Sequence, residues 1–261
     1  MLLTGATGGL GRAIAEALAS RGASLALSSR RGADLEALSS ALPGNGHSSL
    51  VSELGSDGDG RRLAEAAQEG GPVDIFVANA GLPGTGRIEQ LSPEGLLRVL
   101  HVNLEAPIET THALLPGMLE RGGGHFVYVS SLAGKAPSPR SSMYNATKFG
   151  LRGFALAFRQ DLRGTGVGAS LVLPGFIRDA GLFADAQMKL PAGLGTGTPE
   201  QVGSAVVRAV ERDRAEIVVA PPQQRAITAF AHVFPGVAAR AQRGRGERVA
   251  EELAERQKGK R

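Results

Sequence analysis

Short apolar runs alternate along the chain with stretches whose apolar residues recur at helical spacing. Seven runs have the pattern of strands: residues 1–4, 24–28, 49–54, 73–78, 125–130, 166–173 and 216–220. At least six helical stretches lie between them, over residues 10–20, 33–41, 60–69, 93–120, 141–163 and 199–212. Strands that alternate with helices are typical of βα units and a parallel sheet. The pattern predicts an α/β fold with a doubly wound parallel sheet of about seven strands and helices on both faces.

Local signals mark several element ends. Ser92-Pro93-Glu94 combines an N-cap residue, a proline at the first helical position and an acid in the first turn, which is typical of a helix start. We expect this helix to bend at Pro107 before it ends near Glu120. Glycines follow directly after Thr4, so either the first strand is short or the true start of the chain lies upstream of Met1.

Composition fits a globular protein of one main domain. Of the 261 residues, 42% are hydrophobic and 21% charged, which excludes disorder as the main state. The absence of cysteine excludes a disulfide framework, thiolate metal sites and cysteine nucleophiles. The five histidines show no metal-ligand spacing, so we expect no metal site.

The basic pI of about 9.8 reflects one end of the chain. Residues 240–261 hold eight Lys or Arg and four Asp or Glu, which leaves 21 of each sign in residues 1–239. A basic balance can indicate a nucleic-acid or membrane partner. Here the charge lies in a tail, and the body is neutral.

No segment has the features of a signal peptide, and no run of 18 apolar residues exists that could span a bilayer. A cytoplasmic protein is therefore the expectation, with peripheral membrane contact as an open alternative.

The turn after the first strand is rich in glycine. Gly5, Gly9 and Gly11 would allow a tight turn and a close approach of the backbone to a pyrophosphate, and the following helix begins near Leu10. Free N–H groups at a helix start favour an anion. Tight strand-to-helix turns also use glycine without any ligand. The position of these glycines directly after the first strand is what favours a phosphate-binding turn over an ordinary one.

The second strand ends in Ser28-Ser29-Arg30-Arg31. NAD-binding proteins place an acid here for the ribose 2′-hydroxyl, whereas an arginine accommodates a 2′-phosphate. The next acid, Asp34, already lies in the helix. Ser29 and Arg30 therefore favour NADP(H) over NAD(H); the alternative is a solvated arginine pair.

Tyr144 and Lys148 lie four residues apart and so share one helical face. A cation beside a phenol favours the phenolate and lowers the tyrosine pKa, which would make Tyr144 a general acid/base. A surface contact between the two side chains is the alternative. The other tyrosine, Tyr128, lies in an apolar strand and is expected in the core.

Ser130-Ser131 ends a strand at the sheet edge where doubly wound folds bind ligands. Ser131 could hydrogen-bond a substrate carbonyl oxygen while Tyr144 exchanges its proton. The alternative role of Ser131 is to cap a helix or turn.

Five motifs follow one another in the chain: TGATGGLG (4–11), NAG (79–81), VSS (129–131) with Tyr144 thirteen residues later, YNATK (144–148) and PG (174–175). In this order and spacing they resemble the single-domain short-chain dehydrogenases/reductases, over residues 1 to about 220. The resemblance implies a Rossmann-like fold, hydride transfer with a nicotinamide cofactor, and a homo-oligomer.

The resemblance also implies roles for the residues at the motif positions. Tyr144 is then the catalytic acid/base, Lys148 holds the nicotinamide ribose and lowers the tyrosine pKa, and Ser131 orients the substrate carbonyl. Asn103 matches the asparagine that anchors a water in the proton relay. The local pattern and the resemblance together assign cofactor binding to Gly5, Thr7, Gly9, Leu10, Gly11, Ser29, Arg30, Asn79, Ala80, Gly81, Tyr144, Lys148, Pro174 and Gly175.

The chain departs from the family pattern at three places. Ala78 stands where the first asparagine of NNAG is usual, and Glu53-Leu54 stands where many members have an aspartate near the adenine. Asp179 occupies the place of a threonine that often contacts the carboxamide, so that contact would fall to other groups.

Two segments outside the motifs carry open interpretations. Residues 174–199 are glycine-rich and contain Phe176, Leu182, Phe183, Met188, Leu190 and Leu194. We expect this segment to close over an apolar substrate; the alternative is packing of an internal helix. Residues 222–261 form a C-terminal segment after a catalytic and cofactor-binding domain at 1–221.

The C-terminal segment begins with apolar residues 226–235, which are too few to span a membrane but could lie at its interface or pack on protein. Arg243-Gly244-Arg245-Gly246 should break any helix before residues 247–257 resume one. A solvated mixed-charge face, attachment to anionic lipid and nucleic-acid binding are the alternatives for the tail. The last is disfavoured, because no aromatic residues interleave with the arginines.

The leading hypothesis is an NADP(H)-dependent oxidoreductase acting on a carbonyl or secondary alcohol. The alternative is a catalytically idle nucleotide-binding or membrane-associated scaffold with the same fold, which would have no need of Asn103, Ser131, Tyr144 and Lys148 together.

Overall fold

The computed structural model describes residues 1–184, 186, 193–241, 243–257 and 259. Seven strands form one sheet: β1 (Leu2–Thr4), β2 (Ala26–Ser29), β3 (Ser48–Val51), β4 (Ile75–Ala78), β5 (Gly124–Val129), β6 (Val167–Pro174) and β7 (Glu216–Val219). Their order is β3-β2-β1-β4-β5-β6-β7, and every pair of neighbours is parallel. The expected doubly wound sheet is confirmed.

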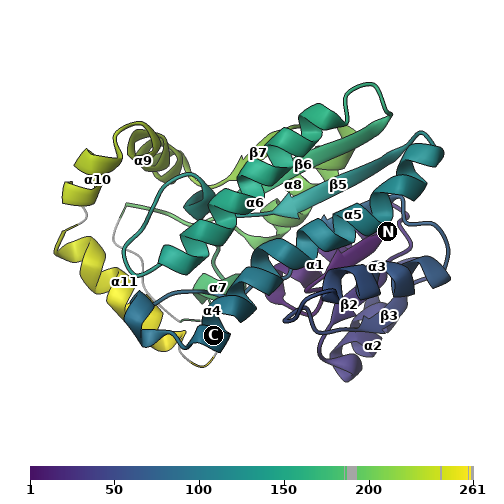
Figure 1. Cartoon of the computed structure of the whole chain (residues 1–261), viewed down its shortest axis with the longest axis horizontal. Coiled ribbons are helices and arrows are strands. Elements are labelled where there is room, and N and C mark those ends of the chain that lie inside the picture. Colours follow the sequence, from purple (N-terminus) through teal and green to yellow (C-terminus); the bar gives the residue numbers. More distant parts are fainter. Residues whose placement is uncertain (185, 187–192, 242, 258, 260–261) are drawn as a thin grey trace.

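Helices cover both faces of the sheet (Figure 1). Those of the body are α1 (Gly9–Ala19), α2 (Gly32–Ala41), α3 (Asp59–Glu69), α4 (Pro93–Leu100), α5 (Ala106–Glu120), α6 (Ser142–Asp161), α7 (Gly181–Ala184) and α8 (Pro199–Glu211). Three C-terminal helices follow: α9 (Pro222–Val233), α10 (Pro235–Ala241) and α11 (Arg245–Arg256). Among the described residues, no helix combines the length and the apolar character that crossing a membrane requires.

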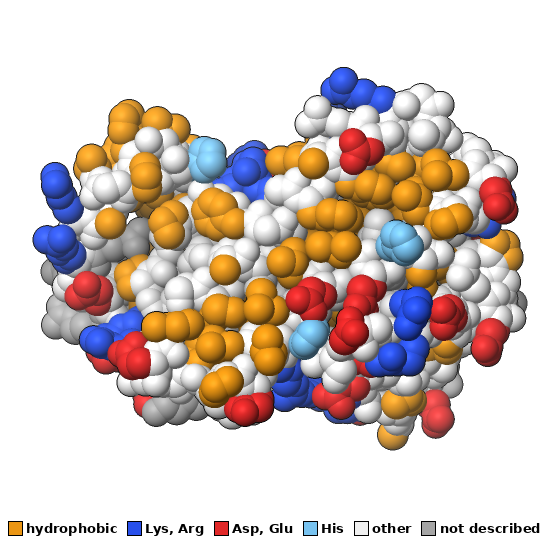
Figure 2. Space-filling view, in the orientation of Figure 1, with side chains coloured by type: hydrophobic (Ala, Val, Ile, Leu, Met, Phe, Trp, Pro, Cys, Tyr) orange, Lys and Arg blue, Asp and Glu red, His pale blue; other side chains and the backbone are white. Residues whose placement is uncertain are grey.

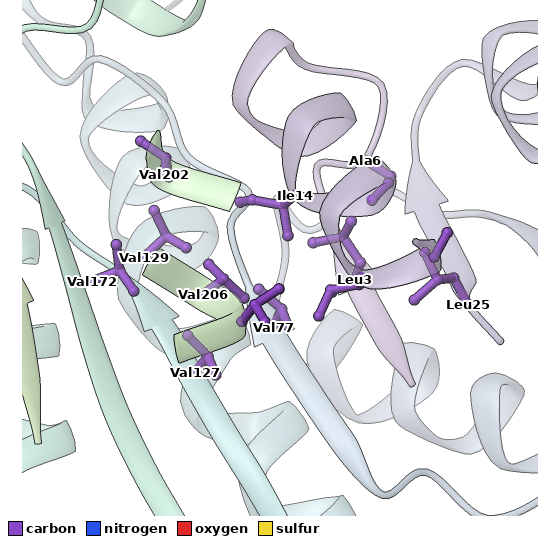
Figure 3. Close-up of a cluster of buried hydrophobic side chains, with 14 of the residues drawn as sticks. Leu3, Ala6, Ile14, Leu25, Val77, Val127, Val129, Val172, Val202 and Val206 are labelled. Carbon is purple, nitrogen blue, oxygen red and sulfur yellow. The ribbon is translucent and has the colours of Figure 1, made fainter. Parts of the chain in front are cut away.

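Successive side chains of the central strands enter two separate cores, because side chains alternate across a strand. In β4, Ile75 and Val77 join the core under α1, α2 and α8, whereas Phe76 and Ala78 join the core under α3, α5 and α6. Figure 3 shows Val77 in the first core together with Ile14 of α1 and Val206 of α8. Burial on both faces explains why the central strands are apolar without interruption.

The strand order reverses between β1 and β4. The carboxyl ends of these neighbours are followed by the glycine-rich turn and by Asn79-Ala80-Gly81. In an open α/β sheet, this reversal leaves a crevice at the carboxyl edge, where ligands bind. The topology thus brings the two motifs together.

A π-helical turn over His101–Glu105 separates α4 from α5, where a bend at Pro107 was expected. The N–H of Ala106 donates to the carbonyl of His101, five residues earlier. Proline has no N–H, so Pro107 cannot donate to the carbonyl of Asn103 as an α-helix would require. The interruption therefore places Asn103 at an irregular turn, and such turns are frequent at functional sites.

The C-terminal helices pack against the carboxyl edge of the body. Gln224 of α9 is buried, accepts a hydrogen bond from the Phe176 N–H at 3.0 Å and donates to the Gly195 carbonyl at 2.8 Å. Gln257, after α11, is also buried; it bonds the Thr85 hydroxyl at 2.8 Å and donates to the Leu182 carbonyl at 2.8 Å. In Figure 1, α9–α11 wrap around this end of the molecule.

His125 gives the fold a dependence on pH at the opposite end of the sheet. Its ring is buried and bonds the Ser170 hydroxyl at 2.8 Å, beside the Arg159–Asp213 ion pair. Burial lowers the pKa of His125 from 6.5 to about 4; Asp213 opposes this and Arg159 adds to it. Between these two pH values the unfolded chain binds the proton and the folded chain does not, so stability falls as the pH falls.

We expect His125→Gln to flatten this dependence, because glutamine keeps a polar partner for Ser170 but does not titrate. The wild-type free energy of unfolding should lose about 3 kcal/mol through His125 between about pH 7 and about pH 4. Urea unfolding at the two pH values measures the loss in both proteins. An equal loss in the variant would show that other groups cause it.

Candidate active site

The glycine-rich turn between β1 and α1 brings the backbone close to itself and to the start of the next crossover. Gly5 has a φ of 64°, and a Cβ there would lie 2.9 Å from the Cα of Ala80. A Cβ on Gly11 would lie 2.1 Å from the Gly5 carbonyl oxygen. Gly8 precedes α1 without a side-chain cap, so the first-turn N–H groups are left for a ligand or solvent. The turn fits a pyrophosphate.

Thr4 and Asn79 hold the turn in place across the strand reversal. The Asn79 amide donates to the carbonyls of Thr4 at 3.1 Å and Gly5 at 3.2 Å. The Thr4 hydroxyl accepts from the N–H groups of Asn79 at 3.0 Å and Ala80 at 3.1 Å. Asn79 therefore fixes the shape of the turn and joins the ends of β1 and β4.

Ser29, Arg30 and Arg31 border the cavity at the end of β2. Arg30 is exposed and lies 4.0 Å from Glu53, which also pairs with Arg98 at 3.0 Å. Arg31 donates to both the carbonyl and the hydroxyl of Thr7 at 3.2 Å. Arg31 was not among the expected binding residues, although its place beside Arg30 was a signal.

Tyr144 and Lys148 face the same side of α6, and the Lys148 ammonium lies 5.8 Å from the centre of the Tyr144 ring. Lys148 is buried and donates to the Val129 carbonyl at 3.2 Å, which ties α6 to the end of β5. A Cβ on Gly81 would lie 3.6 Å from the Lys148 ammonium and 3.5 Å from the Asn103 side-chain oxygen. The NAG motif thus borders the same group of side chains.

Burial sets the proton affinities of this pair. It raises the pKa of Tyr144, and a hydrogen bond with the Ser131 side chain acts in the opposite direction. Burial lowers the pKa of Lys148 from 10.5 to about 8. Desolvation of the phenol dominates the Tyr144 pKa in this structure, and the expected lowering of that pKa by Lys148 stays a prediction. Tyr144 is a phenol at neutral pH, and Lys148 remains mostly charged.

Ser131 has the capping role that was considered for it, and its hydroxyl also lies at the candidate acid/base. Its hydroxyl accepts from the Ala133 N–H at 3.1 Å and so caps the short 3-10 helix Leu132–Gly134. The same side chain hydrogen-bonds Tyr144. Capping therefore holds the hydroxyl at the phenol and does not compete with a role in the site.

Asn103 is buried, and its side chain is fully engaged by protein. Its oxygen accepts from the Leu82 N–H at 2.7 Å, and its amide donates to the Leu82 carbonyl at 2.9 Å and the Thr147 hydroxyl at 3.2 Å. Thr147 in turn donates to the Tyr144 carbonyl at 3.0 Å. Asn103 thus positions the start of α6.

Pro174-Gly175 ends β6 at the cavity, where Gly175 is pressed against α9. A Cβ on Gly175 would lie 2.1 Å from the Gln224 side-chain oxygen, so this position has no room for a side chain. Asp179 has a φ of 65° and a 77% exposed side chain that pairs with Arg178 at 3.4 Å. Asp179 points to solvent and is not among the cavity-lining residues.

A continuous cavity of about 910 Å³ joins these features. It extends from Arg30 and Glu53 past the glycine-rich turn to Ser131, Tyr144 and Lys148. The remaining expected cofactor residues that line it are Gly5, Thr7, Gly9, Leu10, Gly11, Ser29, Asn79, Ala80, Gly81, Pro174 and Gly175. Asn103 stands behind the lining and is absent from it. The size suits a ligand of extended shape.

The far end of the cavity is closed by residues that the motifs did not predict. Those from α9 and from α11 with the turn after it are Gln224, Ile227, Thr228, Ala231, Gly246, Val249, Ala250, Leu253, Gln257 and Gly259. Val249, Ala250, Leu253 and Gln257 recur at helical spacing, which was a readable signal. The helix that was expected at residues 247–257 therefore lies with one of its faces against the cavity.

The segment expected to close over a substrate contributes Phe176, Leu182, Phe183 and Leu194 to the lining. The rings of Phe176 and Phe183 are in contact, with centres 4.8 Å apart. Met188 and Leu190 lie outside the described residues. Ala180 packs on the glycine-rich turn, since a Cβ on Gly9 would lie 2.5 Å from the Cβ of Ala180.

Comparison with known proteins agrees with this geometry. Residues 1–189 match the family model of the short chain dehydrogenases. The chain is 36% identical over 222 residues to the ketoacyl reductase HetN of Nostoc sp. PCC 7120, covering 84% of this chain and 77% of that protein. It is 35% identical over 239 residues to an uncharacterized oxidoreductase of Myxococcus xanthus, covering 90% and 92% of the two chains.

Solved structures show the same architecture. A metagenomic short-chain oxidoreductase, crystallised in complex with NADP, superimposes with a TM-score of 0.70 at 27% identity, covering 84% of this chain and 95% of that one. The family model alone matches well over half of the chain. The chain therefore belongs to the short-chain dehydrogenase family of oxidoreductases.

Proposed function

We propose that this protein transfers a hydride between NADP(H) and the carbonyl or alcohol carbon of a small apolar substrate, with Tyr144 as general acid/base. One observation carries the proposal: the glycine-rich turn and the Ser131, Tyr144 and Lys148 side chains border the same cavity. A site for an anionic dinucleotide thus adjoins a hydrogen-bonded proton donor.

The residues present fit a nicotinamide dinucleotide. The close backbone approach at Gly5 and Gly11 and the uncapped start of α1 suit the pyrophosphate. Lys148, behind Gly81, would hold the nicotinamide ribose, and Pro174-Gly175 would border the nicotinamide. When bound, the cofactor supplies or accepts the hydride.

The chain's own residues handle the proton. Tyr144 is protonated at neutral pH because burial raises its pKa, so its hydroxyl can donate to a developing alkoxide. Ser131 is held at the phenol by its contact with Ala133 and would direct the carbonyl oxygen. Lys148, with a pKa of about 8, keeps a positive charge beside the ring near neutral pH. Above about pH 8 this charge is progressively lost.

The substrate end of the cavity supports an apolar substrate. Its lining there includes Phe176, Phe183, Ile227 and Leu253, contributed by the segment after β6 and by α9 and α11. Apolar walls with a few convergent polar groups are typical of small-molecule sites.

The preference for NADP(H) rests on the arginines after β2. We expect Arg30→Ser to raise the KM for NADPH about tenfold, because an exposed charge-assisted contact to the 2′-phosphate is lost. The KM for NADH should stay within about twofold, since NADH has no such phosphate. Steady-state kinetics with both cofactors measure the change, and Arg21→Ser, which removes an exposed arginine paired with Glu211, is the matched control. Equal changes for the two cofactors would contradict the assignment.

The activity itself is tested with a panel of ketones and secondary alcohols of increasing chain length, each run with NADPH and with NADH. We expect turnover that prefers NADPH and depends on chain length. Tight NADPH binding without oxidation across the panel would favour the alternative of an idle nucleotide-binding scaffold. Activity that ignores chain length would argue against an apolar substrate pocket.

A further inference from the structure

Helices α9 and α10 carry a concentration of exposed apolar side chains. Among the described residues ten large apolar side chains are exposed, and five of them fall between residues 227 and 237. These five, which we call the α9–α10 patch, are Ile227, Phe230, Val233, Phe234 and Val237, with exposed fractions of 47 to 64%. Figure 2 shows hydrophobic side chains gathered over this part of the molecule. Exposed patches of this kind mark interaction sites.

The patch is one continuous face. Ile227 and Phe230 follow helical spacing along α9, and Phe234 lies at its C-cap with its ring centre 5.4 Å from that of Phe230. Gln224, Thr228 and Ala231 of the same helix are buried against the body. The helix therefore packs with a small, polar face and turns its large apolar side chains outward, the reverse of an ordinary surface helix.

The surroundings of the patch are basic. No Asp or Glu occurs between residues 217 and 246, although the chain has 25 such residues. Arg225, Arg240 and Arg243 lie in this stretch, and all three are exposed. In Figure 2, basic side chains lie at the edge of the apolar area. Whatever binds here meets an apolar centre with a positive rim.

We propose that the α9–α10 patch docks on an anionic lipid surface. An interfacial helix buries its apolar face at the boundary of headgroups and acyl chains, and arginines beside it gain from anionic headgroups. The binding strength of such a helix rises with its buried apolar area and with the attraction of its basic residues to anionic lipid, and this segment offers both.

The charge distribution favours lipid over a second copy of the chain. In a two-fold dimer the same patch lies on both subunits, so the arginines of one copy would approach those of the other. Such like-charge contacts oppose association. An anionic surface instead neutralises them. Because Ile227 also lines the cavity, a membrane bound at the patch would lie against one wall of the cavity.

The test is co-sedimentation of the full chain with vesicles of phosphatidylcholine alone and with about one third phosphatidylserine. We expect binding to the anionic vesicles at about 0.1 M salt, with weaker binding at about 0.5 M, because salt screens the arginine contribution. Arg240→Gln/Arg243→Gln should weaken binding about 25-fold, since each arginine contributes about a fivefold factor. Phe230→Ser/Phe234→Ser should weaken it at least about tenfold, because apolar area no longer enters the interface.

Matched variants remove similar groups elsewhere. Val51→Ser/Leu119→Ser removes two exposed apolar side chains, and Arg163→Gln/Arg212→Gln removes two exposed arginines. Both should bind as the wild type does. The arginine variants keep the test valid if the phenylalanine variant does not fold, because they change only exposed side chains.

No binding to anionic vesicles, or equal loss in the matched controls, would overturn the proposal. So would a concentration-dependent dimer, seen by sedimentation, that Phe230→Ser/Phe234→Ser abolishes while vesicle binding is absent. The assay contains neither cofactor nor substrate, so its outcome is independent of the proposed oxidoreductase activity.

Discussion

Tyr144→Phe should lower kcat by about a thousandfold with every active substrate, while the affinity for NADPH stays within about threefold. The change removes the hydroxyl that bonds Ser131 and leaves the ring beside Lys148 in place. A positioned general acid contributes about 10²- to 10⁴-fold to a rate, and the phenylalanine ring has no proton to donate at this place in the cavity. Steady-state kinetics and NADPH fluorescence titration measure the two quantities separately.

The second tyrosine is the matched control. Tyr128 is fully buried in β5 and bonds the Thr111 hydroxyl at 2.8 Å. Tyr128→Phe should therefore cost about 1 kcal/mol of stability, from the hydrogen bond lost to a partner that stays buried, and leave kcat near the wild-type value. If Tyr144→Phe turned over substrate about as fast as Tyr128→Phe, Tyr144 would not be the general acid/base.

Ser131→Ala should lower kcat by about a hundredfold and also move its pH profile. The Ser131 hydrogen bond holds the pKa of Tyr144 below the value that burial alone would give, so its removal raises that pKa further. In the reduction direction the phenol is the active form. The decline of kcat at high pH should therefore begin at a higher pH in the variant. Loss of a positioned donor to a reacting oxygen accounts for the drop itself.

The pH profile distinguishes this role from simple capping of the turn that Ser131 begins. A capping defect would disorder the turn and lower activity without moving the profile upward. Ser142→Ala is the matched control, because it removes an exposed serine hydroxyl at the start of α6. A Ser131→Ala enzyme with kcat within about threefold of wild type would show that Ser131 only caps the turn.

Some properties of the site follow from local sequence because they depend on local geometry. The i, i+4 spacing places Tyr144 and Lys148 on one face of any helix that contains both, and α6 does. Ser92 caps α4 as expected, with its hydroxyl accepting from the Gly95 N–H at 3.1 Å. Glycine at residues 5 and 11 anticipated a turn that has no room for side chains.

Other properties of the site residues depend on which distant parts of the chain pack against them. Burial of the phenol is the largest influence on the Tyr144 pKa, and the spacing of Tyr144 and Lys148 in the sequence carried no information on that burial. Arg31 reaches Thr7 only because β1 and β2 are neighbours in the sheet. The fixed side chain of Asn103 depends on Leu82 and Thr147, which are 21 and 44 residues away.

The C-terminal segment shows the same division most clearly. Sequence located its charge and its helix at residues 247–257, and it left open what the segment attaches to. In the structure one face of α11 closes the cavity, while the large apolar side chains of α9 and α10 face outward. A charge sum and a helical period cannot specify which face is covered, because that depends on packing partners in α7, in the segment after β6 and at Thr85.

By itself the sequence determined the alternation of strands and helices, the parallel sheet, the motifs of the family and the identity of the chemical groups. These follow from periods of two and 3.6 residues and from residue types, which act over a few positions. Tertiary structure alone decided the burial that sets the proton affinities, the extent of the cavity and the covering of its far end. Those properties arise where segments distant in the chain exclude water from one another.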